Sequence, residues 1–145
     1  MPAFPPIEAL LPHRGAMLML EEVVACDDAS IVARASVRPA AWYLDEDGAM
    51  PAWVGLELMA QAIAAHAGVR AAHAGAQTGR RGMLIGCRAY RAAAPAFAAG
   101  SVLEVTARAA TADESGFAAY DCALRSAGRE LASATVKVFV PPEAA

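Results

Sequence analysis

Two polar residues, Glu57 and Gln61, stand four positions apart in an otherwise largely apolar stretch that runs from Pro51 to Gly68. On a helix, residues four apart lie on one face and can contact each other. A carboxylate among apolar residues is costly to ionise without a partner, and such a group can exchange protons with a substrate. The spacing therefore predicts a proton-transfer site at Glu57. A structural glutamate, bonded to Gln61 or to loop amides, is an equally weighted alternative.

The residues that open this stretch could bind a carbonyl oxygen. Pro51 suits the first position of a helix, where its missing N–H costs nothing. Val54 and Gly55 then lie in the first turn, whose free N–H groups and positive dipole end favour an oxygen that gains negative charge. Gly55 would let a ligand approach the backbone closely. Close packing of the helix against a strand explains a glycine there equally well.

Three histidines are candidates for a second proton-transfer group. His13 lies in a turn before the first expected strand, and loops often carry function, although a histidine that bonds local backbone is as common. His66 is nine positions after Glu57, on the opposite side of a helix with about 3.6 residues per turn, which favours a core or interface role. His73 lies near the expected helix end, where it would complement the dipole. His13 is therefore the candidate partner of Glu57.

The rest of the chain predicts strands around one helix. Apolar and polar residues alternate along several segments, as they do in strands with one solvent face, while residues 83–89 look like a buried strand. A short helical lead-in is expected at residues 5–11 and a hairpin turn at 126–129. The expected strands are residues 16–24, 31–38, 83–89, 102–110, 117–125 and 131–140. This order predicts an α+β fold with a long central helix wrapped by an antiparallel sheet of five to six strands, in a single domain over residues 1–145.

Composition excludes several classes of protein. The chain is 57% hydrophobic and 19% charged, which indicates a folded protein. Its net charge of -3 argues against general nucleic-acid binding, and the polar residues within the longest apolar run argue against a membrane span. The absence of a basic segment in residues 1–6 and the three scattered cysteines predict a cytoplasmic protein without a metal centre. A helix that is apolar on all sides needs more cover than one sheet provides, which predicts a dimer.

Two motifs resemble those of a known enzyme family. The run Leu10-Leu11-Pro12-His13-Arg14 is followed by Met17-Leu18-Met19-Leu20, and Met50-Pro51 is followed by Glu57-Leu58-Met59-Ala60-Gln61. Together they resemble the hot-dog-fold dehydratases that act on 3-hydroxyacyl chains of acyl carrier protein. The helix segment resembles most the dehydratase-like subgroup found with aryl polyene biosynthesis genes.

The resemblance implies a hot-dog fold and an activity that removes water from a 3-hydroxyacyl thioester to give a trans-2-enoyl thioester. It implies no cofactor of the protein's own, because the acyl group is carried on the phosphopantetheine of acyl carrier protein or on coenzyme A. The implied partners are acyl carrier protein and a second hot-dog subunit, identical or different. Glu57 and a histidine would be catalytic. The implied substrate-binding residues are Val54, Gly55, Gln61, Tyr43 and Trp53.

The chain departs from the family pattern at the histidine. In the family this residue lies in a His-Phe-Pro-Gly loop before the helix, and Tyr43 occupies the corresponding position here; no histidine lies between Arg14 and Gln61. His13 could reach the site, a partner subunit could supply a histidine, or the protein could have lost dehydration. Thioester hydrolysis and a non-catalytic partner subunit are therefore the alternative functions. The arginines Arg80, Arg81, Arg88 and Arg91 are hypothesised to steer an acidic carrier protein.

Overall fold

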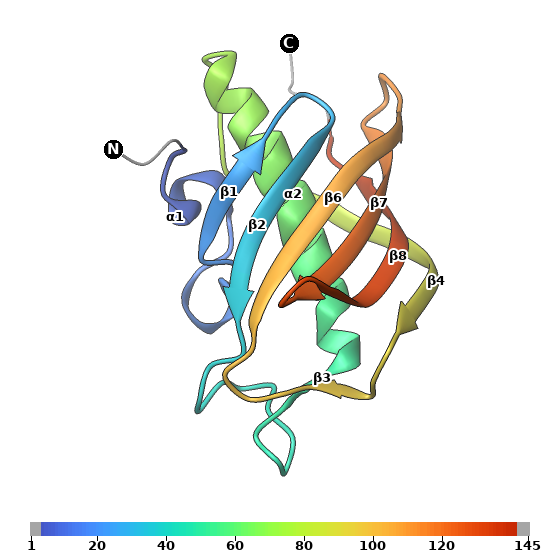
Figure 1. The fold of residues 1–145 in the computed structure, drawn as a ribbon. Helices are drawn as coiled ribbons and strands as arrows, with labels where there is room; N and C mark the ends of the chain where they lie inside the picture. The colour runs from blue at the N-terminus through green and yellow to red at the C-terminus, as the bar shows by residue number, and fades with distance from the viewer. Residues whose placement is uncertain (1–3, 142–145) are drawn as a thin grey trace.

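A long helix lies against a curved antiparallel sheet in the computed structural model, which describes residues 4–141 (Figure 1). The strands are β1 (Glu22–Cys26), β2 (Ser30–Ser36), β3 (Met50–Pro51), β4 (Met83–Ala92), β5 (Ala96–Phe97), β6 (Val102–Ala112), β7 (Phe117–Ser126) and β8 (Arg129–Phe139). Six of them form one sheet in the order β1-β2-β6-β7-β8-β4, while β3 and β5 pair separately. The predicted α+β class, with one helix wrapped by an antiparallel sheet, is confirmed.

The central helix α2 (Gly55–His73) begins after a 3₁₀ turn, η2 (Ala52–Val54). Pro51 has φ -54° and ψ 140° and therefore precedes this turn, so its expected placement at the first helical position is wrong. The helix packs on the sheet through small and medium apolar side chains, which allow the two layers to approach closely. Its fully buried residues include Leu58, Met59, Ala62 and Ala65.

The strand expected at residues 16–24 forms only at its last three residues. A short helix, α1 (Ile7–Leu10), and a 3₁₀ turn, η1 (Gly15–Met17), precede it, and β1 begins at Glu22. Apolar residues fill the segment because Met19 and Leu20 are buried. The backbone there bonds to a side chain of α2, and apolar content alone does not reveal this. By contrast, the hairpin turn at 126–129 is confirmed, because Ser126 pairs with Arg129.

Strand β4 corrects the expectation of a buried strand at residues 83–89. It forms the end of the sheet, bonded to β8 alone, and every β4 residue except Gly86 and Tyr90 is exposed. Its apolar residues Met83, Leu84 and Ile85 are about half exposed. Exposed apolar side chains of this kind are typical of surfaces that contact other molecules.

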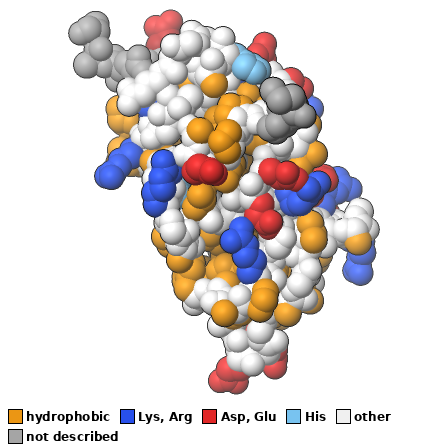
Figure 2. Space-filling view, turned by 90° about the vertical axis from the view of Figure 1, so that its left-hand side faces the viewer, with side chains coloured by type: hydrophobic (Ala, Val, Ile, Leu, Met, Phe, Trp, Pro, Cys, Tyr) orange, Lys and Arg blue, Asp and Glu red, His pale blue; other side chains and the backbone are white. Residues whose placement is uncertain are grey.

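Figure 2 views the molecule from the side on which α1 lies in Figure 1, and there acidic and basic side chains are interspersed with hydrophobic ones. This face carries no continuous basic surface. No helix within residues 4–141 is long and apolar enough to cross a membrane. Residues 1–3, part of the amino-terminal stretch considered in the sequence, lie outside the described residues.

Candidate active site

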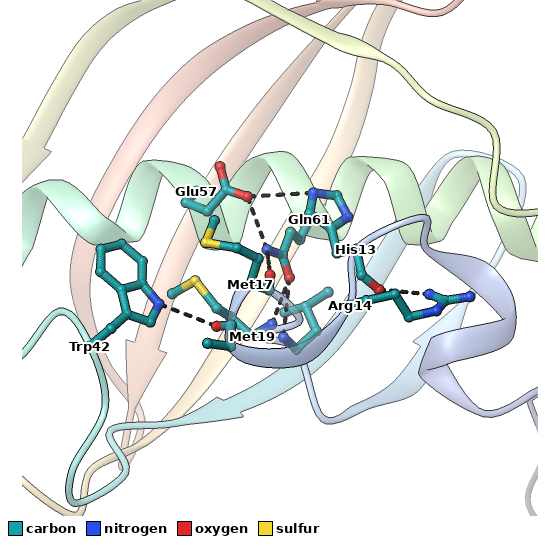
Figure 3. Close-up of polar contacts among 9 residues, drawn as sticks. His13, Arg14, Met17, Met19, Trp42, Glu57 and Gln61 are labelled. Carbon is teal, nitrogen blue, oxygen red and sulfur yellow. Dashed lines mark hydrogen bonds and ion pairs between the residues drawn. The ribbon is translucent and has the colours of Figure 1, made fainter.

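His13 and Glu57 face each other across the start of α2 (Figure 3). The distance from His13 Nε2 to Glu57 Oε1 is 3.5 Å, and the two side chains are 27% and 32% exposed. The turn that carries His13 is held by Arg14, whose guanidinium donates to the carbonyl oxygens of Leu11 (2.7 Å) and His13 (2.6 Å). One chain thus brings an imidazole and a carboxyl group together at 3.5 Å, slightly beyond direct hydrogen-bond reach and close enough for both to contact one small substrate group.

Gln61 joins Glu57 to the segment that follows His13. Its amide oxygen accepts the N–H groups of Met19 (3.0 Å) and Leu20 (3.3 Å), and its Nε2 donates to the carbonyl of Met17 (2.7 Å) and to Glu57 Oε1 (2.9 Å). The side chain is completely buried. These bonds use both donors and both acceptor positions of the amide, and they fix its orientation. Gln61 therefore holds Glu57 in place and has no group left for the substrate contact that was expected of it.

Glu57 is partly open to a hollow, so the sequence-based expectation of an enclosed carboxylate is too strong. The hollow has a volume of about 600 Å³, and both His13 and Glu57 line it. One wall of the hollow is the helix, along Ala60, Ala64 and Ala67. At the rise of an α-helix, Ala67 lies about 15 Å along the axis from Glu57. A volume of this size is typical of a small-molecule site.

The Nδ1 atom of His13 is buried and has no hydrogen-bond partner within the described part of the chain. Buried polar atoms in proteins are nearly always paired. Nδ1 of His13 is thus an exception among the described residues, while Nε2 faces Glu57.

The start of the helix differs from the expected carbonyl-binding site. The N–H of Gly55 donates to the carbonyl oxygen of Ala52, so this amide is not free. A β-carbon at Gly55 would lie 2.6 Å from Leu124 Cδ1 and would also collide with the Tyr90 hydroxyl. Close packing against the sheet therefore explains the glycine, and contact of Gly55 with substrate stays a prediction. Val54 is buried in η2, and its role in binding substrate stays a prediction.

The aromatic candidates do not line the hollow that His13 and Glu57 line. Tyr43, at the position of the family histidine, lines a second hollow of about 340 Å³ together with Met19 and Leu58. Its hydroxyl donates to the carbonyl of Ser36 (3.4 Å), and burial raises its pKa. Trp53 is 65% exposed and lines neither hollow. Substrate contact by Tyr43 and Trp53 stays a prediction.

His66 has the core role that its spacing from Glu57 indicates. It is fully buried, with Nδ1 2.7 Å from the Tyr120 hydroxyl and Nε2 2.9 Å from the carbonyl oxygen of Asp27. Burial lowers the pKa of His66, so the imidazole is held neutral. Within residues 4–141, no group of three histidine, cysteine or acidic side chains could hold a metal ion.

Tyr90 is a residue near the site that the sequence did not reveal. It comes from β4, more than thirty positions after Glu57, and its hydroxyl donates to the carbonyl of Ala52 at the helix start. A tyrosine in a strand pattern gives no sign of such a contact, since the contact depends on how the sheet curls around the helix.

Comparisons with known proteins show which family and which solved structures the chain resembles. The family model described as ApeP-like, ApeP dehydratase, matches residues 5–145. A solved structure described as the dehydratase heterocomplex ApeI:P from Xenorhabdus doucetiae is 29% identical and superposes with a TM-score of 0.91, covering 97% of this chain and 93% of that chain. No curated protein matches the chain.

More distant structures share the hot-dog fold alone. A mutant of the phenylacetic acid degradation protein PaaI from Thermus thermophilus has a TM-score of 0.61 at 22% identity, over 82% of this chain and 91% of that chain. A hypothetical thioesterase with coenzyme A from Streptococcus pneumoniae has a TM-score of 0.64 at 16% identity, over 86% of this chain and 88% of that chain.

Proposed function

Because the chain belongs to the ApeP-like dehydratase family, we propose that it removes water from a 3-hydroxyacyl thioester, with Glu57 and His13 as the proton-transfer pair. The observation that carries the proposal is the 3.5 Å separation of His13 Nε2 and Glu57 Oε1 within one chain. His13 then takes the role of the histidine that Tyr43 replaces in the loop. The pair needs no histidine from a partner subunit.

In the proposed reaction, one member of the pair removes the proton from C2 and the other donates a proton to the leaving hydroxyl at C3. A double bond forms between C2 and C3, and the products are a trans-2-enoyl thioester and one water molecule. The base gains the proton from C2 and the acid loses a proton to the departing water. Transfer of one proton from the former base to the former acid restores the protonation of both groups. The N–H that Gln61 donates to Glu57 favours a single orientation of the carboxyl group during these transfers.

We propose acyl carrier protein as the donor of the substrate. Arg80 and Arg81 line the same hollow as Glu57, and their charge suits the phosphate of phosphopantetheine and the acidic surface of a carrier protein. Arg88 and Arg91 are exposed on β4, which continues from this segment. A cytoplasmic location stays a prediction from the sequence.

We further propose that a second hot-dog subunit covers β4 and the open side of α2. The exposed apolar residues of β4 support this pairing, as does the similarity to a structure described as a dehydratase heterocomplex. That description also favours a second candidate function, in which the chain is one subunit of a heteromeric dehydratase and is inactive alone. Activity that appears only on mixing with a partner subunit would distinguish this case.

The test is mass spectrometry of a 3-hydroxyacyl carrier protein incubated with the full chain, alone and with a partner subunit. Loss of one water is the expected result, whereas release of free carrier thiol would indicate hydrolysis. Glu57→Gln and His13→Asn should each lower the rate roughly 100-fold or more, the usual contribution of a general acid or base. Glu8→Gln, at an exposed carboxyl of α1, is the matched control. Full activity of Glu57→Gln would refute the assignment.

A further inference from the structure

Tyr90 links the open edge of the sheet to the start of the helix that carries Glu57. Its hydroxyl donates a hydrogen bond to the carbonyl oxygen of Ala52 in η2. Together with Gly86, it is one of the two β4 residues that are partly buried. Burial raises the pKa of Tyr90 to about 12, so the hydroxyl remains protonated and able to donate at neutral pH.

A bulge in β4 lies directly beside this tyrosine. The pairing of β4 with β8 changes register between Arg88 and Arg91, so Ala89 and Tyr90 together face a single residue of β8. Ala89 has φ 55°, a left-handed conformation that is uncommon for a residue with a β-carbon. Such a conformation persists only where the surrounding structure imposes it. Bulges redirect side chains, and this one accompanies the inward position of Tyr90.

The first turn of the helix is built around the same contact. The Ala52 carbonyl accepts both the Tyr90 hydroxyl and the N–H of Gly55, which uses both acceptor positions of that oxygen. The Ala52 N–H donates to the carbonyl of Pro95 (2.9 Å). A β-carbon at Gly55 would collide with the Tyr90 hydroxyl, so the glycine leaves the room that the bond requires.

We propose that Tyr90 is a positioning residue, which fixes the turn from which α2 begins and thereby the direction in which Glu57 faces His13. The inference rests on the proposed role of Glu57 in proton transfer. It also connects the open edge of the sheet to the site, because Tyr90 belongs to β4. A subunit that docks on β4 would contact the strand that carries this hydrogen bond. A looser first turn lowers the fraction of time for which Glu57 is aligned, so kcat falls while KM changes little.

Tyr90→Phe in the full chain, with its partner subunit present, tests the proposal by two measurements. Hydrogen exchange of the amides at residues 52–56 should become roughly 3- to 10-fold faster, the usual effect of one lost hydrogen bond. The kcat for dehydration should fall by a similar factor. Thr106→Val is the matched control, because it removes a hydroxyl that donates to a backbone carbonyl, that of Ala123, between β6 and β7, and Thr106 lines neither hollow; exchange at 52–56 and kcat should not change.

Unchanged exchange at residues 52–56 in Tyr90→Phe would overturn the proposal, as would faster exchange with an unchanged kcat. A double-mutant cycle with Gly55→Ala adds an independent test. The added methyl group should slow the enzyme less when the Tyr90 hydroxyl is already absent, and strictly additive effects would contradict the shared contact. If the wild-type protein does not dehydrate its substrate, the proposed function fails, while the exchange measurement still reports whether Tyr90 holds the turn.

Discussion

Replacement of Gln61 by leucine should be the most damaging single change in the site. The leucine side chain has nearly the same volume, so the substitution removes hydrogen bonds without leaving a large cavity. Gln61 bonds to the N–H groups of Met19 and Leu20 and to the carbonyl of Met17. Gln61→Leu leaves these three backbone groups, in a segment where Met19 and Leu20 are buried, without partners.

The loss can be worked out from these contacts. Each unpaired buried group costs about 1 to 3 kcal/mol, so three of them set an upper limit of about 9 kcal/mol. Water that enters beside the partly exposed Met17 end recovers part of this, and we expect a decrease of about 3 to 5 kcal/mol in the free energy of unfolding. That is a large fraction of the roughly 5 to 15 kcal/mol by which a domain is stable.

Urea denaturation followed by circular dichroism measures this decrease. Gln77→Leu is the matched control, because Gln77 is exposed in the loop after α2, and it should change the free energy of unfolding by no more than about 0.5 kcal/mol. Gln61→Leu should also lower dehydration at temperatures where the protein remains folded, because Glu57 loses its donor. A loss below about 1 kcal/mol for Gln61→Leu would refute the view that Gln61 substitutes for a strand partner.

Three other changes have defined outcomes. Ala127→Asn should stabilise the protein by about 0.5 to 1 kcal/mol in thermal denaturation, because Ala127 has φ 50° in a hairpin turn that favours asparagine; no gain would contradict this. Since burial lowers the pKa of His66, the unfolded state binds its proton first, and stability should fall as the pH drops below about 6.5. His66→Gln should lose that dependence and His73→Gln should keep it; a dependence that survives His66→Gln assigns it elsewhere. Arg81→Glu should weaken carrier-protein binding and flatten its salt dependence relative to Arg125→Glu, at an exposed position of β7; equal effects would exclude the arginines of the hollow.

The sequence predicted the parts of the fold that follow from local patterns. Alternating residues indicated β2, β6, β7 and β8, and the i to i+4 spacing of Glu57 and Gln61 predicted the contact between them, which measures 2.9 Å. The approach of His13 to Glu57 was one of several alternatives, and the sequence could not select it. The distance between a turn and a helix depends on tertiary packing, which no local pattern encodes.

The segments that were predicted wrongly share one physical cause. Their hydrogen-bond or packing partners come from outside the segment, so its own residue pattern does not reveal them. Residues 17–20 look like a strand, yet the side chain of Gln61 provides the bonds that a neighbouring strand would. The apolar run of β4 looks buried because its side chains are apolar, although nothing within the described chain covers it. The short pair β3 and β5, of two residues each, is too brief to give any periodic signal.

The uncovered edge of β4 has a consequence for how the protein must be produced in a cell. Free backbone groups beside exposed Met83, Leu84 and Ile85 form a template on which other extended chains can add, which is the usual start of aggregation. A chain that leaves this edge uncovered would therefore be lost to aggregates or to proteases. If the proposed second subunit is a different chain, a single strand thus requires balanced synthesis of the two, and co-expression should raise the yield of intact protein.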